Sequence, residues 1–596
     1  MDTLASLLSA HREGRRTPSE TVRETYRRIA AHDDPAMFIT LRPEADLLAE
    51  AAKLEAEGKS DLPLYGIPVA IKDNIDVAGL PTTAACPAFA YEATADATVV
   101  ARLKAAGALI VGKTNLDQFA TGLVGTRSPY GVPRNAFNAS LVPGGSSSGS
   151  ASAVSAGIVP LALGTDTAGS GRVPAMLQNI VGVKPSLGLV PNTGLVPACK
   201  TLDCISIFAL TVDDAMAALE VMAGPDAADA FSRPLPLGTL GTLSAPPRLG
   251  ILPPDQREFF GDAEAAAAYE AAIARFKALG ADLVPFDYSP FAECARLLYE
   301  GPWVAERWIV AEPLLTTHPE AVHPVTRAIT EPGGKASAAD AFRATYRLRE
   351  LKAKVDPILA GLDAILLPTA PTAYTLEAVL ADNIRLNSRN GTYTNFVNLM
   401  DLCGTAVPNT ISAHGIPYGI TLLAPAGRDA EVASIARAFV AGGNLPLGAS
   451  GERASAPDLP PLVEAGRMDL CVFGAHLSGM GLNSELLELG ARLVAPVETA
   501  PLYRMTLLTG AVPRPGVTRV ASGGAAIAGE VWSLPFEGIG RLLARIPAPL
   551  GLGRVVLSDG REVAGFLAEA AGTEGCPDIT AYGGFRAFAA SRAKSA

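Results

Sequence analysis

Residues 142–175 read VPGGSSSGSASAVSAGIVPLALGTDTAGSGRVPA, and this stretch holds two clusters of glycine, serine and other small residues. The first cluster runs from Gly144 to Ser150 and the second from Thr165 to Arg172. Glycine at this density lets the backbone approach a ligand closely and adopt conformations that other residues avoid. Taken singly, each cluster is explained equally well as a polar turn.

A lysine upstream of these clusters is unusual for its position. Lys72 ends the apolar run Ile67–Ile71 within GIPVAIKDN, and such a run is typical of a buried strand. Because burying a charge is costly, one interpretation is that Lys72 reaches solvent or pairs with Asp73 or Asp76. The other interpretation is that Lys72 is a functional group.

Three segments taken together decide between these interpretations. GIPVAIKDNIDVAG, GGSSSGSASAV and LGTDTAGSGRVPA occur in this order, with Ser146 74 residues after Lys72 and Ser170 24 residues after Ser146. Motifs, order and spacing resemble the amidase signature family over roughly residues 1–440. Helix and strand patterns also alternate through this region, which predicts an α/β fold with a mixed central β-sheet covered by helices.

The resemblance implies a Ser–cisSer–Lys triad that hydrolyses amides. It assigns Ser170 as the nucleophile, Ser146 as the proton shuttle after a cis peptide bond, and Lys72 as the base. A serine needs a base to act as a nucleophile, and the motifs contain no histidine. Lys72 can accept a proton only if burial lowers its pKa. The oxyanion hole is expected from the backbone amides of the residues that lead up to the nucleophile, namely Thr167, Ala168, Gly169 and Ser170.

Two other features of the clusters have more than one interpretation. Gly145–Gly149 matches G-x-S-x-G, which would make Ser147 the nucleophile with a histidine partner. That motif needs a strand running directly into it, and Pro143-Gly144 interrupts, so this alternative is disfavoured. Asp166 and Arg172 are interpreted as a buried pair that holds the loop, in preference to a direct catalytic part.

Composition excludes several classes of protein. The 596 residues carry 49 Lys and Arg against 60 Asp and Glu, a net charge of −11, which gives no basic excess for nucleic acid. The seven cysteines are scattered and form no C-x-x-C pair, which predicts reduced thiols in the cytoplasm and no metal site or cofactor. No apolar run reaches about 18 residues, so no membrane span or signal peptide is expected.

The chain is predicted to contain two domains joined by a linker. Residues 1–443 form the amidase domain, and residues 444–465 form a proline-rich linker. Residues 466–596 show short strand patterns, one helix and a hairpin signal at Asp559-Gly560, which predict a smaller α+β domain.

This combination of domains resembles the allophanate hydrolases within the amidase signature family. The segment VFGAHLSGM at 472–480 resembles their second domain, which looks like a gamma-glutamylcyclotransferase-type fold. The acidic motif of a cyclotransferase should follow the strand GEVW, and Glu537 is a poor match for it. Cyclotransferase activity is therefore not expected.

The resemblance also implies a substrate and its binding residues. Allophanate is urea carrying a carboxylate, which Tyr299 and Arg307 would bind, with a backbone contact at Gly122. His476 is a candidate for breakdown of N-carboxycarbamate in the second domain, or a structural loop histidine. A homodimer and a functional link to urea carboxylase or biuret hydrolase are expected. The alternatives are another amidase, such as the amidase component of a tRNA-dependent amidotransferase, and a non-catalytic scaffold.

Overall fold

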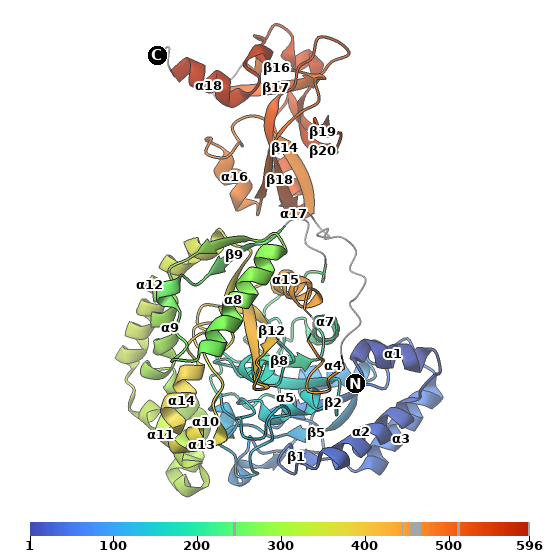
Figure 1. Cartoon of the computed structure of the whole chain (residues 1–596), viewed down its shortest axis with the longest axis vertical. Helices are drawn as coiled ribbons and strands as arrows, with labels where there is room; N and C mark the ends of the chain where they lie inside the picture. Colours follow the sequence, from blue (N-terminus) through green and yellow to red (C-terminus); the bar gives the residue numbers. More distant parts are fainter. Residues whose placement is uncertain (242–245, 444, 453–466, 509–512, 594–596) are drawn as a thin grey trace. The chain divides into compact units, whose positions relative to one another are not determined.

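The chain divides into two units, Met1–Leu462 and Val463–Ala596, and each has its own sheet (Figure 1). The computed structural model describes residues 1–241, 246–443, 445–452, 467–508 and 513–593. Most of the predicted linker, namely residue 444 and residues 453–465, lies outside the described residues.

The first unit contains alternating strands and helices. Its strands are β1 (Phe38–Leu41), β2 (Pro68–Lys72), β3 (Pro81–Thr82), β4 (Tyr91–Glu92), β5 (Leu109–Thr114), β6 (Leu161–Asp166), β7 (Val181–Lys184), β8 (Cys204–Ala209), β9 (Arg248–Ile251), β10 (Asp282–Pro285), β11 (Ala364–Pro368), β12 (Leu402–Ile411) and β13 (Pro417–Pro425). Its helices are α1 (Leu4–Arg12), α2 (Pro18–His32), α3 (Glu44–Glu57), α4 (Thr98–Ala105), α5 (Ser148–Ser155), α6 (Val173–Leu177), α7 (Val212–Met222), α8 (Ala263–Ala278), α9 (Ser289–Glu300), α10 (Val304–Thr317), α11 (Pro324–Thr330), α12 (Ala338–Ala360), α13 (Leu376–Ala381), α14 (Asn383–Asn390) and α15 (Asp429–Ala441).

An eleven-stranded sheet organises this unit, with the order β1-β5-β2-β6-β8-β7-β12-β13-β11-β9-β10. β2 runs parallel to β5 and β6, and β9 runs parallel to β10 and β11, while the other neighbours are antiparallel. The predicted mixed sheet is therefore confirmed. Helices cover both of its faces, as β2 illustrates: Val69 and Ile71 pack in a core with residues of α7, α8 and α15, whereas Ala70 between them packs with α2, α3 and α5.

Three neighbouring parallel strands bring the sequence motifs together. β5, β2 and β6 end at Thr114, Lys72 and Asp166, and the motif loops follow β5 and β6 directly. Because the carboxyl ends of parallel strands meet at one edge of a sheet, these loops share that edge. The fold thus places residues far apart in sequence at one location.

Strand β7 begins a run whose composition is typical of a loop. The run Gly182–Pro191 is rich in proline and glycine, but its start belongs to strand β7, which pairs with β8 and β12. The β-branched Val181 and Val183 supply a buried strand, and Gly182 is required because the carbonyl of Gly171 lies where a Cβ would stand. The sheet therefore packs directly against the loop that carries Ser170.

The second unit has a five-stranded sheet with the order β15-β18-β14-β20-β19 and a separate pair, β16 and β17. Its elements are β14 (Arg467–Val472), α16 (Asn483–Glu488), β15 (Arg492–Glu498), β16 (Tyr503–Leu508), β17 (Arg514–Arg519), β18 (Ala528–Pro535), α17 (Phe536–Leu543), β19 (Leu550–Val556), β20 (Glu562–Ala568) and α18 (Phe585–Ala593). The hairpin expected around Asp559-Gly560 joins β19 to β20. The predicted α+β character is confirmed.

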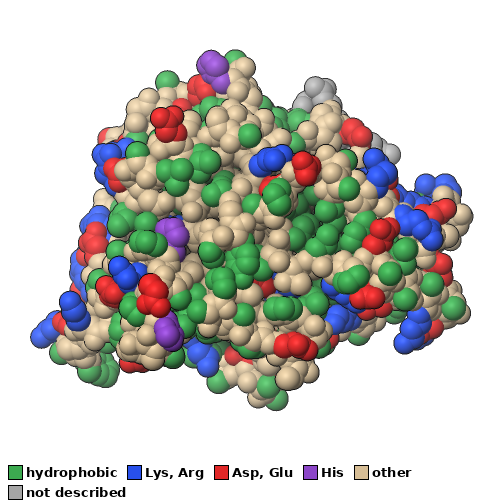
Figure 2. Space-filling model, turned by 90° about the horizontal axis from the view of Figure 1, so that it is seen from below, with side chains coloured by type: hydrophobic (Ala, Val, Ile, Leu, Met, Phe, Trp, Pro, Cys, Tyr) green, Lys and Arg blue, Asp and Glu red, His purple; other side chains and the backbone are tan. Residues whose placement is uncertain are grey.

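The surface and the helices agree with the composition. Figure 2 shows one face of the molecule, on which Lys and Arg side chains are interspersed with Asp and Glu. In the part of the chain that the structure describes, no helix is both long and apolar enough to cross a membrane. Among the same residues, no cluster of three or more His, Cys, Asp and Glu side chains is placed to hold a metal ion.

Candidate active site

Lys72 lies at the end of β2 and is completely buried. Its Nζ donates hydrogen bonds to Ser146 Oγ at 2.8 Å and to Thr165 Oγ1 at 2.7 Å. Asp73 is paired instead with Lys113, whose Nζ lies 3.3 Å from Asp73 Oδ1. Lys72 therefore neither reaches solvent nor forms the ion pair that the simpler interpretation offered.

Burial determines the charge state of Lys72. Loss of solvation lowers the pKa of this amine to about 7, against the opposing influence of the carboxylates of Asp117, Asp203 and Asp166. A lysine with a pKa near neutrality is deprotonated in an appreciable fraction of molecules at neutral pH. Lys72 can therefore accept a proton, which an ordinary lysine cannot do.

Ser146 lies in a tightly packed loop just before α5. The Gly145–Ser146 peptide bond is cis, as the family resemblance implied. The Ser146 carbonyl accepts a hydrogen bond from the Asp117 amide at 3.0 Å. A side chain at Gly145 would collide with the Asp117 carboxylate and with the backbone at Gly125, so only glycine fits there.

Ser147 has a different environment from its neighbour. Its hydroxyl is within 3.2 Å of both the amide and the carbonyl of Thr165, so it ties two backbone segments together. No strand runs directly into Ser147, since residues 142–147 form an irregular segment before α5. These contacts do not match the alternative in which Ser147 is a nucleophile paired with a histidine.

Ser170 lies in the loop between β6 and α6 and is 1% exposed. Its Oγ is 3.4 Å from the carbonyl oxygen of Gly122. The Arg172 guanidinium binds Asp166 through two hydrogen bonds of 2.9 Å, and both side chains are completely buried. The predicted Asp166–Arg172 pair is therefore confirmed.

The backbone amides around Ser170 are not all free. Asp166 accepts hydrogen bonds from the amides of Gly169 at 2.9 Å and Gly171 at 3.0 Å. The Gly169 amide, predicted as an oxyanion donor, is thus already engaged within the loop. Thr167, Ala168 and Ser170 remain as the candidate donors.

Tyr299 and Arg307 are brought together although a bend separates them. Tyr299 lies near the end of α9, Arg307 lies on α10, and Gly301-Pro302 separates the two helices. Arg307 Nη2 is 3.4 Å from Tyr299 Oη, and the guanidinium carbon is 5.3 Å from the centre of the tyrosine ring. Arg307 is only 3% exposed, so it is not a surface arginine.

Arg307 is also connected to the loop that contacts Ser170. Its Nη1 donates to Thr121 Oγ1 at 2.9 Å, and the next residue is Gly122, whose carbonyl lies beside Ser170 Oγ. Arg307 Nε is buried without a hydrogen-bond partner. Arg307, which keeps an unused donor, and Ser170 therefore contact consecutive residues of one loop.

Three further residues belong to this site although the motifs gave them no role. Thr165 binds Lys72, and Asp117 accepts hydrogen bonds from the amides of Gly125 and Arg127 at 2.9 Å each. Asp203 accepts a hydrogen bond from the Thr167 hydroxyl, and burial raises its pKa to about 6. Thr165 lies inside a recognised motif and could have been found there, whereas nothing in the local sequence marks Asp203.

Comparison with known proteins identifies the family. Residues 20–433 match the family described as amidase. A glutamyl-tRNA(Gln) amidotransferase component from Picosynechococcus is 34% identical over 462 residues, which are 71% of this chain and 94% of that protein. The chain belongs to the amidase family. The predicted amidase signature core is therefore confirmed.

The rest of the chain matches a narrower group. Residues 468–590 match the family described as allophanate hydrolase C-terminal domain. A solved structure of Kluyveromyces lactis allophanate hydrolase is 41% identical, with a TM-score of 0.76 and 99% of each chain covered. The urea amidolyase of Lachancea kluyveri is 43% identical over 94% of this amidase. This amidase spans only 31% of that relative's length.

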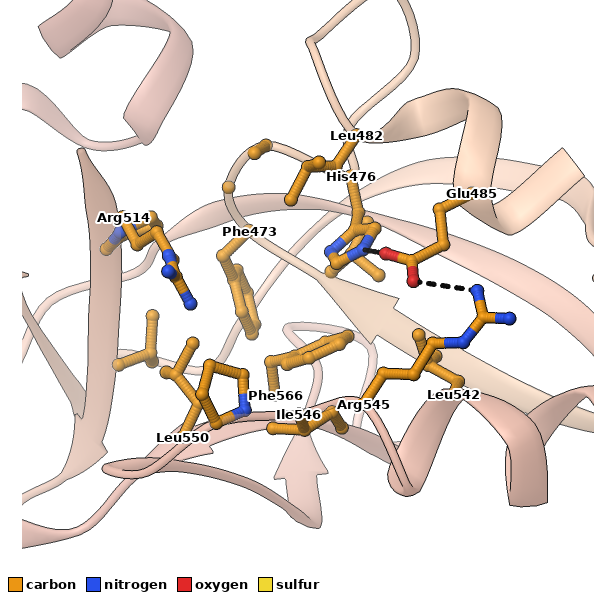
Figure 3. A pocket seen from close by; sticks show the side chains of 16 residues that line it. Phe473, His476, Leu482, Glu485, Arg514, Leu542, Arg545, Ile546, Leu550 and Phe566 are labelled. Carbon is orange, nitrogen blue, oxygen red and sulfur yellow. Dashed lines mark hydrogen bonds and ion pairs between the residues drawn. The ribbon is translucent and has the colours of Figure 1, made fainter. Parts of the chain in front are cut away.

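The second unit of this amidase contains a pocket of about 310 Å³ (Figure 3). His476 projects into it and stacks on Phe566, with ring centres 5.2 Å apart. His476 Nε2 is 3.0 Å from Glu485 Oε2, and Glu485 Oε1 is 3.2 Å from Arg545 Nη1. The hydrogen bond from His476 holds the pKa of Glu485 below its usual value.

Arg514 lines the opposite side of the same pocket (Figure 3). Two guanidinium groups, an imidazole and the Glu485 carboxylate therefore border the cavity, and most of its other lining residues are apolar. Glu537, the poor match for a cyclotransferase acid, is exposed and is not among the lining residues. The buried acid of the strand GEVW is Glu530 itself, which binds Ser478, Trp532 and Arg586.

Proposed function

We propose that this amidase hydrolyses allophanate, with Ser170 as the nucleophile. The observation that carries the proposal is the path from Arg307 through Thr121 and Gly122 to Ser170. The site therefore holds both a serine nucleophile and a buried guanidinium, and a guanidinium can bind a carboxylate through two parallel hydrogen bonds. Allophanate presents a carboxylate one atom away from the amide carbonyl, which suits a guanidinium and a serine that contact consecutive residues of one loop.

The chemistry follows from the contacts of Lys72. Neutral Lys72 accepts the Ser146 proton, and Ser146 accepts the Ser170 proton as Ser170 Oγ bonds to the amide carbonyl carbon. The amides of Thr167, Ala168 and Ser170 stabilise the oxyanion. The C–N bond to the terminal nitrogen breaks, and that nitrogen takes the proton and leaves as ammonia. Water then hydrolyses the acyl-enzyme along the same proton path, which gives N-carboxycarbamate.

The test compares allophanate with biuret, a neutral amide of similar size. Ammonia release should have a much higher kcat/KM for allophanate, because biuret offers no charge to Arg307. Equal values for the two substrates would mean that this amidase does not select a carboxylate. The alternative, a component of an amidotransferase, predicts glutamine-dependent ammonia release instead, which the same assay can measure.

The second unit is proposed to act on the product of the first. N-carboxycarbamate is a dianion, and Arg514 and Arg545 place two cations at the pocket that contains His476. The gamma-glutamylcyclotransferase-like description is proposed for the fold alone, since exposed Glu537 argues against that activity. The test is ¹³C NMR of the reaction with labelled allophanate, in which loss of His476 should let N-carboxycarbamate accumulate.

The remaining expectations concern association and pathway. A homodimer is proposed, and sedimentation velocity of the full chain tests it. The reaction that supplies allophanate is proposed to be urea carboxylation or biuret hydrolysis. Addition of a urea carboxylase or a biuret hydrolase to this amidase should convert urea or biuret, respectively, to ammonia.

A further inference from the structure

A face of α14 carries buried polar side chains toward the site around Ser170. Asn387 and Asn390 lie three residues apart on α14, and Thr394 follows in the next turn. Asn387 and Asn390 share one side of α14, whereas Thr394 lies in the turn after the helix. All three side chains are no more than 4% exposed. Two of the three have polar atoms without partners: both amide atoms of Asn390 and the hydroxyl of Thr394.

The residues on either side of Asn390 in the sequence contact the loops near Ser170. Asn387 Oδ1 accepts a hydrogen bond from the Leu123 amide at 2.7 Å, directly after Gly122. Thr394 Oγ1 lies 2.5 Å from the point that a Cβ of Gly169 would occupy, directly before Ser170. Asn387, on the same side of α14 as Asn390, and Thr394, in the turn after it, therefore adjoin the Gly122 and Ser170 loops.

An unpartnered buried carboxamide is costly. Leaving a buried donor or acceptor without a hydrogen bond costs about 1–3 kcal/mol, and Asn390 leaves both its donor and its acceptor unused. Leucine has a similar size and would avoid this cost. A ligand that supplies one acceptor and one donor would offset it.

We propose that Asn390 is a specificity-determining residue that binds the central N–H of allophanate. This inference rests on the proposed function. Asn390 Oδ1 accepts a hydrogen bond from the nitrogen between the two carbonyl carbons, and Nδ2 donates to a neighbouring substrate oxygen. Arg307 recognises the carboxylate, whereas Asn390 recognises the ureido nitrogen that distinguishes allophanate from other short carboxylated amides.

Malonamate provides the test, because it keeps the carboxylate and the scissile amide but has a methylene in place of the central N–H. Asn390→Leu should lower kcat/KM about 5- to 100-fold on allophanate, where two hydrogen bonds are lost, and about 2- to 10-fold on malonamate, where one is lost. The deciding quantity is the ratio of the two values. The unfolding midpoint of Asn390→Leu should stay the same or rise. If Asn390 had a purely structural role, its replacement would lower that midpoint.

Two further variants complete the experiment. Asn390→Asp keeps the size and the acceptor but brings a negative charge toward the substrate carboxylate, so KM for allophanate should rise. Asn409→Leu is the matched control, because Asn409 is also a buried asparagine with an unpartnered amide oxygen but contacts α8 through Ala268. It should leave the ratio of the two substrates unchanged.

An equal loss on both substrates in Asn390→Leu, or no loss on either, would overturn the assignment. Should Asn390→Leu fail to fold, an unchanged KM for allophanate in Asn390→Asp would overturn it as well. Failure of the proposed function is distinguishable, because the unaltered enzyme would then release ammonia from neither substrate.

Discussion

Lys72 and Arg545 are both cations in a candidate site, but Lys72 is fully buried whereas the Arg545 side chain is 49% exposed. Burial lowers the pKa of Lys72 to about 7 and turns it into a base. The pocket of the second unit keeps its charges paired in contact with solvent, with Glu485 between His476 and Arg545. In the proposed function, the first site moves protons and the second holds an anion.

The largest effect is expected at the nucleophile. Ser170→Ala should lower kcat for ammonia release at least about a thousandfold, because no other group can form the acyl-enzyme. Ser147→Ala is the matched control, since it removes a hydroxyl that bonds only to the Thr165 backbone. The Ser147→Ala variant should be somewhat less stable than the unaltered enzyme but should retain its activity. A dead Ser147→Ala with an active Ser170→Ala would reverse the assignment.

Replacing Lys72 should nearly abolish activity and also stabilise the protein. Lys72→Met should lower kcat/KM at least about a hundredfold, since a general base is lost. In the unaltered enzyme, kcat/KM should fall about tenfold per pH unit below the Lys72 pKa of about 7, because the protonated amine cannot accept a proton. A pH–rate profile that is flat between pH 5 and 8 would contradict a neutral lysine base.

The stability prediction follows from the lowered pKa of Lys72. The unfolded lysine binds a proton below about pH 10.4, whereas the folded one binds it only below about 7, so folding is penalised at lower pH. Relative to the unaltered enzyme, Lys72→Met should gain most in free energy of unfolding at pH 7 and below. The gain should fade as pH rises toward 10. Denaturant titrations across this range measure it.

A smaller effect is expected for the carboxylate anchor. Arg307→Ala should lower kcat/KM on allophanate about 10- to 100-fold, the effect of losing one charged hydrogen bond, and should change the value for biuret little. Arg307→Lys should retain part of the activity because it keeps the charge but loses the planar pair of donors. An equal loss on both substrates would mean that Arg307 supports the fold.

Changes in the second unit should not affect the reaction of the first unit. His476→Ala should leave the rate of the first ammonia release unchanged while N-carboxycarbamate persists longer. A fragment of residues 1–452 should fold and keep that first rate. It includes Gly448 and Ala449, whose backbone bonds to Asn179 and Ser155 of the first unit. A fragment that does not fold, beside a full chain that does, would refute independence of the units.

The sequence predicted the elements that depend on local patterns. The buried strand ending at Lys72 follows from its apolar run, and the hairpin at Asp559-Gly560 follows from its turn residues. The local pattern does not predict strand β7, because its glycine and flanking loop resemble a turn, and the packing of Gly171 against Gly182 explains it only in the folded chain.

The site was predictable where a motif is continuous and not where it depends on tertiary contacts. Lys72, Ser146 and Ser170 lie in recognisable motifs, and the structure brings Lys72 into contact with Ser146. Asp203 lies outside these motifs, and its place beside the site depends on a tertiary hydrogen bond from the Thr167 hydroxyl. The engagement of the Gly169 amide by Asp166 also could not be inferred from residue type alone.

Capture of the acyl-enzyme tests the role of Ser170 most directly. The full chain is mixed with allophanate, quenched in acid within one turnover, digested and examined by mass spectrometry. We predict a carbamoyl group on the peptide that carries Ser170, because the carboxycarbamoyl ester loses CO2 in acid, and no such group in Ser170→Ala. An adduct on the peptide that carries Ser147, or rapid ammonia release with Ser170 never modified, would contradict this assignment.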